Sequence, residues 1–110
     1  MTGIIKVITT GDNRDIIEDI GKKIVEMRLA ACAQIAGPIK SIYWWKGKIE
    51  ETEEWCCILK STEGLYKKIE ETIVKLHPYE LPEIIAVRIE DALPEYIQWV
   101  MDETELSRGK

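Results

Sequence analysis

Two unusually long stretches with an extended-chain pattern, Ala31 to Trp45 and Lys48 to Ser61, are separated only by Lys46-Gly47. A glycine at such a junction favours a tight hairpin turn. At about 3.4 Å per residue, the first stretch would reach roughly 50 Å. A domain of 110 residues spans only about 35 Å. We therefore expect this hairpin to project beyond the sheet from which it arises.

Shorter elements precede and follow the hairpin. Ile4 to Thr9 is an apolar run rich in β-branched residues, which predicts a strand. Apolar residues then recur at helical spacing, and Asp12 or Asn13 is placed to cap that helix. A second helix is predicted from about Gly64 to Leu76. It should end before His77-Pro78, because the residue before a proline is disfavoured in helical geometry.

The last part of the chain adds a strand and a helix. Ile84 to Ile89 is apolar almost throughout, which predicts a strand covered on both faces. Asp91 is expected to cap a final helix with Pro94 in its first turn. The order β-α-β-β-α-β plus a terminal helix predicts an α/β (α+β) ferredoxin-like sandwich, with helices on one face of an antiparallel sheet. We expect one domain over residues 1–110.

The projecting hairpin is rich in aromatic residues, including Tyr43, Trp44 and Trp45. Such a surface promotes aggregation unless another chain covers it. A solvated flexible arm is the alternative, but adjacent tryptophans point to opposite faces of a strand, so one of them needs a partner. We therefore expect a homo-oligomer closed by rotational symmetry, with these three residues in its interface.

Charge and motif content exclude several classes of protein. Lys and Arg number 15 against 20 Asp and Glu, and this net charge of −5 opposes binding to nucleic acid. No apolar run approaches the length of about 20 residues that crosses a membrane. The three cysteines include the adjacent Cys56 and Cys57 and do not form a disulfide framework, which favours a cytoplasmic location. The absence of a phosphate loop or nucleophile elbow predicts no enzymatic activity.

Four motifs carry a family resemblance over Ile4 to about Met101. They are Arg28-Leu-Ala-Ala-Cys32, Ile42-Tyr-Trp-Trp-Lys-Gly-Lys-Ile-Glu50, Leu59-Lys-Ser-Thr62 and Leu76-His-Pro-Tyr-Glu-Leu-Pro-Glu-Ile-Ile85. In order and spacing the chain resembles the CutA family of divalent-cation tolerance proteins. The resemblance implies a cytosolic homotrimer packed through the long hairpins, with a role in tolerance to copper and other divalent ions. It also implies an architecture like that of the PII signalling proteins.

His77 is the only histidine and is therefore central to any metal site. Imidazole suits copper or zinc, and a thiolate would strengthen the site. The resemblance implies that Cys32 lies near His77, with Glu80 or Glu83 as a carboxylate ligand; we take His77, Cys32 and Glu83 as the predicted set. The expected cofactor is Cu²⁺ or another divalent cation, with no organic cofactor. The alternative is that the His77 ring only forms hydrogen bonds across a subunit boundary.

The chain also departs from the family pattern. Some copper-binding members carry cysteine where this chain has Thr9 and histidine where it has Leu76, which weakens the prediction of copper binding. A second hypothesis is a PII-like trimer that senses a small anionic ligand in a pocket near Lys60 and Tyr79, without a physiological metal site. A strand-end lysine paired with a carboxylate is the alternative for Lys60. We expect the acidic residues of the hairpin to form a solvated face: Glu50, Glu51, Glu53 and Glu54.

Overall fold

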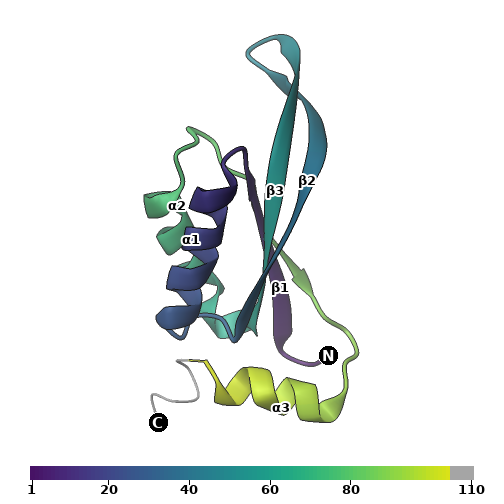
Figure 1. The fold of residues 1–110 in the computed structure, drawn as a ribbon. Coiled ribbons are helices and arrows are strands. Elements are labelled where there is room, and N and C mark those ends of the chain that lie inside the picture. Colours follow the sequence, from purple (N-terminus) through teal and green to yellow (C-terminus); the bar gives the residue numbers. More distant parts are fainter. Residues whose placement is uncertain (105–110) are drawn as a thin grey trace.

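The fold is a four-stranded antiparallel sheet with two helices on one face, seen in a computed structural model that describes residues 1–104 (Figure 1). The strand order is β2-β3-β1-β4, which confirms the predicted ferredoxin-like arrangement. Residues 105–110 of the predicted domain lie outside the described residues. In chain order the elements are β1 (Ile4–Gly11), α1 (Arg14–Glu26), β2 (Cys32–Trp45), β3 (Lys48–Thr62), the 3-10 helix η1 (Glu63–Leu65), α2 (Tyr66–Leu76), β4 (Ile84–Arg88) and α3 (Pro94–Asp102).

The β2–β3 hairpin extends well beyond the other strands, as its length predicts (Figure 1). The molecule measures 47 × 26 × 21 Å, with a long axis well beyond the span typical of a domain this size. Lys46 and Gly47 form the turn, and both have positive φ angles of 50° and 82°. These are the angles of a tight hairpin turn whose twist matches that of the strands. The pairing register shifts once, between Ala36 and Ile39, where Gly37-Pro38 interrupts the ladder.

The hydrophobic core lies between the sheet and the helices α1 and α2. Helix α1 lies close to the sheet at Gly21, where a Cβ atom would lie 3.0 Å from the Cys57 sulfur. Cys57 is fully buried, whereas the adjacent Cys56 is only half-buried, as strand alternation requires. The core side chains come from both layers: Ile5, Val7, Ile17, Ile20, Ile24, Leu59, Ile69 and Ile73.

The helix ends follow local rules, with one correction. Asn13 caps α1, because its side chain accepts a hydrogen bond from the Ile16 amide. Helix α2 ends at Leu76, as the following His-Pro sequence predicts. The prediction that Asp91 caps the last helix is wrong. Helix α3 begins at Pro94, so Leu93 occupies the cap position and supplies no side-chain hydrogen bond.

The second face of the sheet is largely open. Ile8, Ile58 and Ile85 lie in register across three strands and face away from the helices. Strand β4 is an edge strand, and Ile85 is 46% exposed, so within one chain the prediction of a strand covered on both faces is wrong. The helices α1 and α2 pack on the other face only, which leaves this apolar row without cover.

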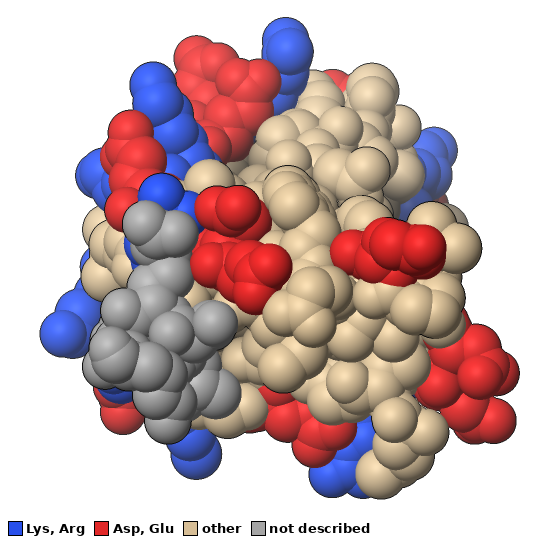
Figure 2. Space-filling model, turned by 90° about the horizontal axis from the view of Figure 1, so that it is seen from below, with Lys and Arg blue, Asp and Glu red and all other residues tan. Residues whose placement is uncertain are grey.

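Helix α3 closes one end of the molecule, below the sheet in Figure 1. Arg28, just after α1, forms an ion pair of 2.7 Å with Glu103, just after α3, while Val100 of α3 is fully buried. In the surface seen from below, uncharged residues occupy most of the centre, with acidic groups interspersed and basic groups mainly around the margin (Figure 2). In this view the described residues form no central basic patch that would attract an anion.

Candidate functional site: an acidic groove beside the hairpin

A groove of about 760 Å³ lies between the projecting hairpin and the segment from Tyr79 to Glu83. This volume falls within the range of small-molecule sites. Part of its lining comes from the end of β1 and part from the hairpin, so long hairpin strands are needed to form it. The lining residues are Thr10, Asp12, Ser41, Ile42, Tyr43, Trp44, Trp45, Thr52, Glu54, Tyr79, Glu80, Leu81, Pro82 and Glu83.

Glu54 is the buried carboxylate of the groove, with 5% of its surface exposed. One carboxylate oxygen accepts a hydrogen bond of 2.6 Å from the Ser41 hydroxyl, and the other accepts one of 2.7 Å from the Tyr79 hydroxyl. Burial and this bond to Glu54 raise the pKa of Tyr79. Among the described residues, no lysine or arginine forms an ion pair with Glu54, so its negative charge meets only neutral donors.

The prediction of a solvated acidic face is wrong for Glu54. Strand alternation places Glu54 on the side of β3 that meets Ser41 and Tyr79, whereas Glu53 points away and is exposed. Glu54 pairs with Ile39, the first β2 residue after the register shift. The alternation of side chains along β3 could have predicted that Glu53 and Glu54 point to opposite faces. Four acidic residues within five positions make this difference hard to recognise from composition alone.

His77 is 7% exposed and does not itself line the groove, but it contacts two residues that do, Thr10 at the end of β1 and Tyr79. Its Nδ1 atom accepts a hydrogen bond of 3.1 Å from the Tyr79 amide. That bond assigns the ring proton to Nε2, which donates to the Thr10 carbonyl at 2.6 Å. Both ring nitrogens therefore have partners within the chain, and metal binding by His77 would require one of these bonds to break.

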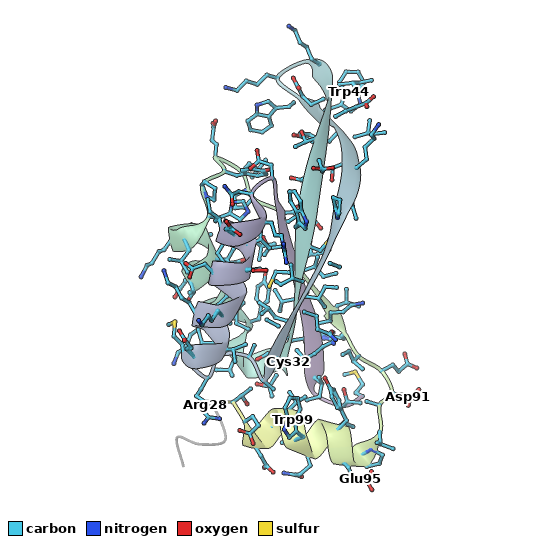
Figure 3. The ribbon with its side chains drawn as sticks, viewed as in Figure 1. Arg28, Cys32, Trp44, Asp91, Glu95 and Trp99 are labelled. Atoms are coloured by element: carbon cyan, nitrogen blue, oxygen red, sulfur yellow. The ribbon has the colours of Figure 1, made fainter. Side chains whose placement is uncertain are left out.

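The structure does not bring the three predicted metal ligands together within one chain. Cys32 pairs in register with Lys60 at the far end of the sheet, where its sulfur lies 3.8 Å from the Tyr96 hydroxyl of α3 (Figure 3). Glu83 lies in the groove and accepts a long hydrogen bond of 3.4 Å from Thr10. Within residues 1–104, no group of three or more His, Cys, Asp or Glu side chains could hold a metal ion.

The two predicted ligand-pocket residues are also apart. Tyr79 lines the groove, but Lys60 lies at the Cys32 end of the sheet. The Lys60 ammonium donates a hydrogen bond of 2.8 Å to the side-chain oxygen of Gln34. The prediction that Lys60 lies near Tyr79 is wrong within one chain. The segment after α2 meets the hairpin part of β3, whereas Lys60 lies near the other end of that strand.

The hairpin aromatic residues divide between two faces. The Tyr43 hydroxyl lies 2.8 Å from the Thr52 hydroxyl, and alternation places Trp45 on the same face as Tyr43. Trp44 points to the opposite face near the hairpin tip and is 72% exposed (Figure 3). Tyr43 and Trp45 therefore lie on one face of β2 and Trp44 on the other, although all three line the groove near the hairpin tip.

The groove as a whole favours positive charge. Its lining contains four carboxylates, and none of the described lining residues is Lys, Arg or His. Carboxylate oxygens suit hard divalent cations, and aromatic faces suit organic cations. The same lining repels a small anion. The acidic members are Asp12, Glu54, Glu80 and Glu83.

This sheet order, the elongated hairpin and the groove beside it define a ferredoxin-like α+β protein with an oversized β2–β3 hairpin. The family model described as CutA1 divalent ion tolerance protein matches residues 5–103. The chain belongs to this family.

Three relatives from prokaryotes agree with this chain along nearly their whole length. The divalent-cation tolerance protein CutA of Thermotoga maritima is 42% identical over 90% of this chain and 97% of its own. The crystal structure of CutA from Xylella fastidiosa superposes with a TM-score of 0.90 at 34% identity, covering 94% of this chain and 99% of that one. The protein of Archaeoglobus fulgidus, described as a periplasmic divalent cation tolerance protein CutA, gives 0.89 at 33% identity, over 93% and 99%. In residues 1–104, no helix has the length and apolar character needed to span a bilayer.

Proposed function

We propose that the protein acts as a homotrimer in the response to divalent metal ions and binds the ion where subunits meet. Family membership supports the link to divalent ions. The exposed aromatic surface of Trp44 and the uncovered apolar row that includes Ile85 support assembly, because a single chain leaves both in water. The observation that carries the proposal is the acidic lining of the groove, which attracts cations and includes one of the predicted ligands, Glu83.

The proposed metal site is composite. Because His77 and Cys32 lie at opposite ends of the sheet in one chain, a site with both needs ligands from two copies. Glu83 is an exposed carboxylate that one copy offers in the groove, as are Asp12 and Glu80. Copper suits this mixture of imidazole, thiolate and carboxylate. The proposal assigns the protein no catalytic reaction.

Native mass spectrometry before and after one equivalent of Cu(II) per chain tests the proposal. We expect a trimer that takes up about one copper per subunit, and we expect His77→Ala and Cys32→Ser each to lose that copper while remaining trimeric. Cys56→Ser is the matched control, because it removes a half-buried thiol that strand alternation places on the same face of the sheet. Unchanged copper uptake in both ligand variants would contradict the composite site, and a monomer would contradict the assembly.

Ligand sensing is a second candidate function, and the size of the groove favours it. Tyr79 lines this groove, as that hypothesis requires, but Lys60 lies outside it. The carboxylate lining argues against the anionic ligand that the sequence suggested. A PII-like sensor of this kind would therefore need a ligand of the opposite charge.

A cytoplasmic location belongs to the same proposal. Cys32, Cys56 and Cys57 are all free thiols, which suits a reducing compartment. The relative from Archaeoglobus fulgidus is described as periplasmic, so fractionation of cells that express this chain is the direct test. Recovery with periplasmic markers would contradict the proposal.

A further inference from the structure

The charge of Glu54 is not balanced within the described part of the chain. Its carboxylate is almost excluded from water, and its two named partners are the neutral hydroxyls of Ser41 and Tyr79. A buried carboxylate without a counter-charge is costly unless a cation joins it. Each carboxylate oxygen can accept two hydrogen bonds and accepts one here. Both oxygens of Glu54 can therefore take a further donor.

We propose that the groove binds a linear aliphatic polyammonium ion, with one ammonium group on Glu54 and another near Glu83. This inference rests on the ligand-sensing candidate, which it deepens by naming the class of ligand. It shares Glu83 with the proposed copper site, but Glu54 lies outside that site, so spermidine binding and copper uptake can fail separately. A primary ammonium carries three donors and one charge, and so supplies both things that Glu54 lacks.

The remaining walls of the groove suit the body of such a ligand. Tyr43, Trp45 and Tyr79 supply aromatic surface, and an ammonium group over an aromatic face gains a cation–π interaction. Leu81 and Pro82 add apolar surface that would contact the methylene groups of the ligand. This combination of carboxylates and aromatic rings is typical of sites that recognise organic ammonium ions.

The spacing of the acidic groups favours a chain of charges over one metal ion. No group of three or more potential metal ligands converges within residues 1–104, although four carboxylates line the groove. A bare divalent cation needs several oxygens at one point. A polyamine carries its charges several ångströms apart on a flexible chain, so it can reach carboxylates that do not converge. The net charge of −5 would attract such a ligand at long range.

Isothermal titration calorimetry with spermidine, on the assembled protein at physiological salt, tests this inference. We expect saturable binding in the parent protein and a loss of affinity of roughly 30-fold or more in Glu54→Gln, since that variant removes a desolvated charge. Glu53→Gln is the matched control, because it removes the same charge from the adjacent, exposed position. We expect its affinity to stay within about twofold of the parent.

Glu83→Gln guards against a folding defect in Glu54→Gln, because Glu83 is exposed. We expect a roughly threefold to tenfold loss of affinity in this second variant. Equal spermidine affinity in the Glu53, Glu54 and Glu83 variants would overturn the proposal. ATP serves as a probe for the anionic ligand that the sequence predicts. If ATP raises the melting temperature and spermidine does not bind, the polyammonium class is wrong, but ligand sensing survives. If neither compound binds, both fail.

Discussion

Tyr79 links three features of the site through a single residue. Its backbone amide fixes the tautomer of His77, its hydroxyl donates to Glu54, and its ring lies 4.7 Å from the His77 ring in an edge-on arrangement. The segment after α2 is therefore held against both β1 and the hairpin. The shape of the groove depends on these contacts, because this segment forms one of its walls.

Alkaline pH should reveal the environment of Tyr79. Its raised pKa means that the native state holds the phenol proton more tightly than the unfolded state, where a tyrosine titrates near pH 10. The associated stability is fully present below about pH 10 and decreases as pH rises toward the native pKa. We expect Tyr79→Phe to lose about 1 kcal/mol at neutral pH and to lose less further stability than the parent between about pH 9 and pH 11.

Urea unfolding at those two pH values measures the difference. Burial also raises the pKa values of Tyr66 and Tyr96, so the variant should keep part of the pH dependence. Equal losses in parent and variant between the two pH values would contradict the assignment to Tyr79.

At this scale the sequence was informative about residue types but not about their partners. His77 was identifiable as the only imidazole, yet its tautomer depends on the Tyr79 amide and the Thr10 carbonyl, which come together only in the fold. Glu54 is chemically identical to its acidic neighbours and differs only in the direction of its side chain. Such distinctions depend on register and burial, which composition does not report.

Close packing of α1 on the sheet sets the position of the central layer. At Gly21, the hypothetical Cβ atom would lie 3.0 Å from the Cys57 sulfur and 3.1 Å from the Ala33 Cβ atom, both closer than ordinary van der Waals contact. Gly21 therefore serves the approach of helix to sheet, although glycine lowers helix stability.

Gly21→Ala should destabilise the protein despite the better helix propensity of alanine. The propensity gain of about 1 kcal/mol is opposed by an overpacking cost of about 1 to 3 kcal/mol, so we expect a net loss of roughly 1 kcal/mol. Urea denaturation measures this loss. In a Cys57→Ala background the same substitution should cost less, because the sulfur is absent. A more stable Gly21→Ala protein would show that the helix can shift away freely.

The elements themselves were largely predictable, because periodicity and turn residues act locally. The break at Gly37-Pro38 and the end of α2 at Leu76 follow from proline geometry. The capping error at Asp91 arose because an acidic residue near a proline resembles a cap signal. Only the position immediately before the first helical residue can cap, and Leu93 occupies it.

On the scale of the whole molecule, one chain leaves too much apolar surface uncovered. The hairpin carries exposed Ile42, Trp44 and Ile49, and the open sheet face adds Ile85 and Val87. A monomer would keep these side chains in water, and the unpaired edges of β2 and β4 would remain available. The uneven strand lengths predict the projecting hairpin directly, whereas the number of copies that cover it requires a measurement.

A pair of charge substitutions tests where copies meet. Trp44→Glu should weaken self-association by roughly tenfold or more, because it places a charge in the proposed apolar interface. Val74→Glu is the matched control, since Val74 is exposed on α2, on the helical face of the molecule. Analytical ultracentrifugation across a concentration series distinguishes them. The same association constant in both variants would exclude Trp44 from the interface.

The central place of β1 affects how the chain folds during its synthesis. Among the strands of the sheet this one is synthesised first, but its partners are β3 and β4, and β4 is synthesised last. At 5 to 20 residues per second, β1 waits roughly 4 to 15 s for its last partner. The hairpin needs only local contacts and forms in about 1 to 10 μs once its strands are free. The newborn chain therefore exposes its aromatic hairpin for seconds before β4 completes the sheet.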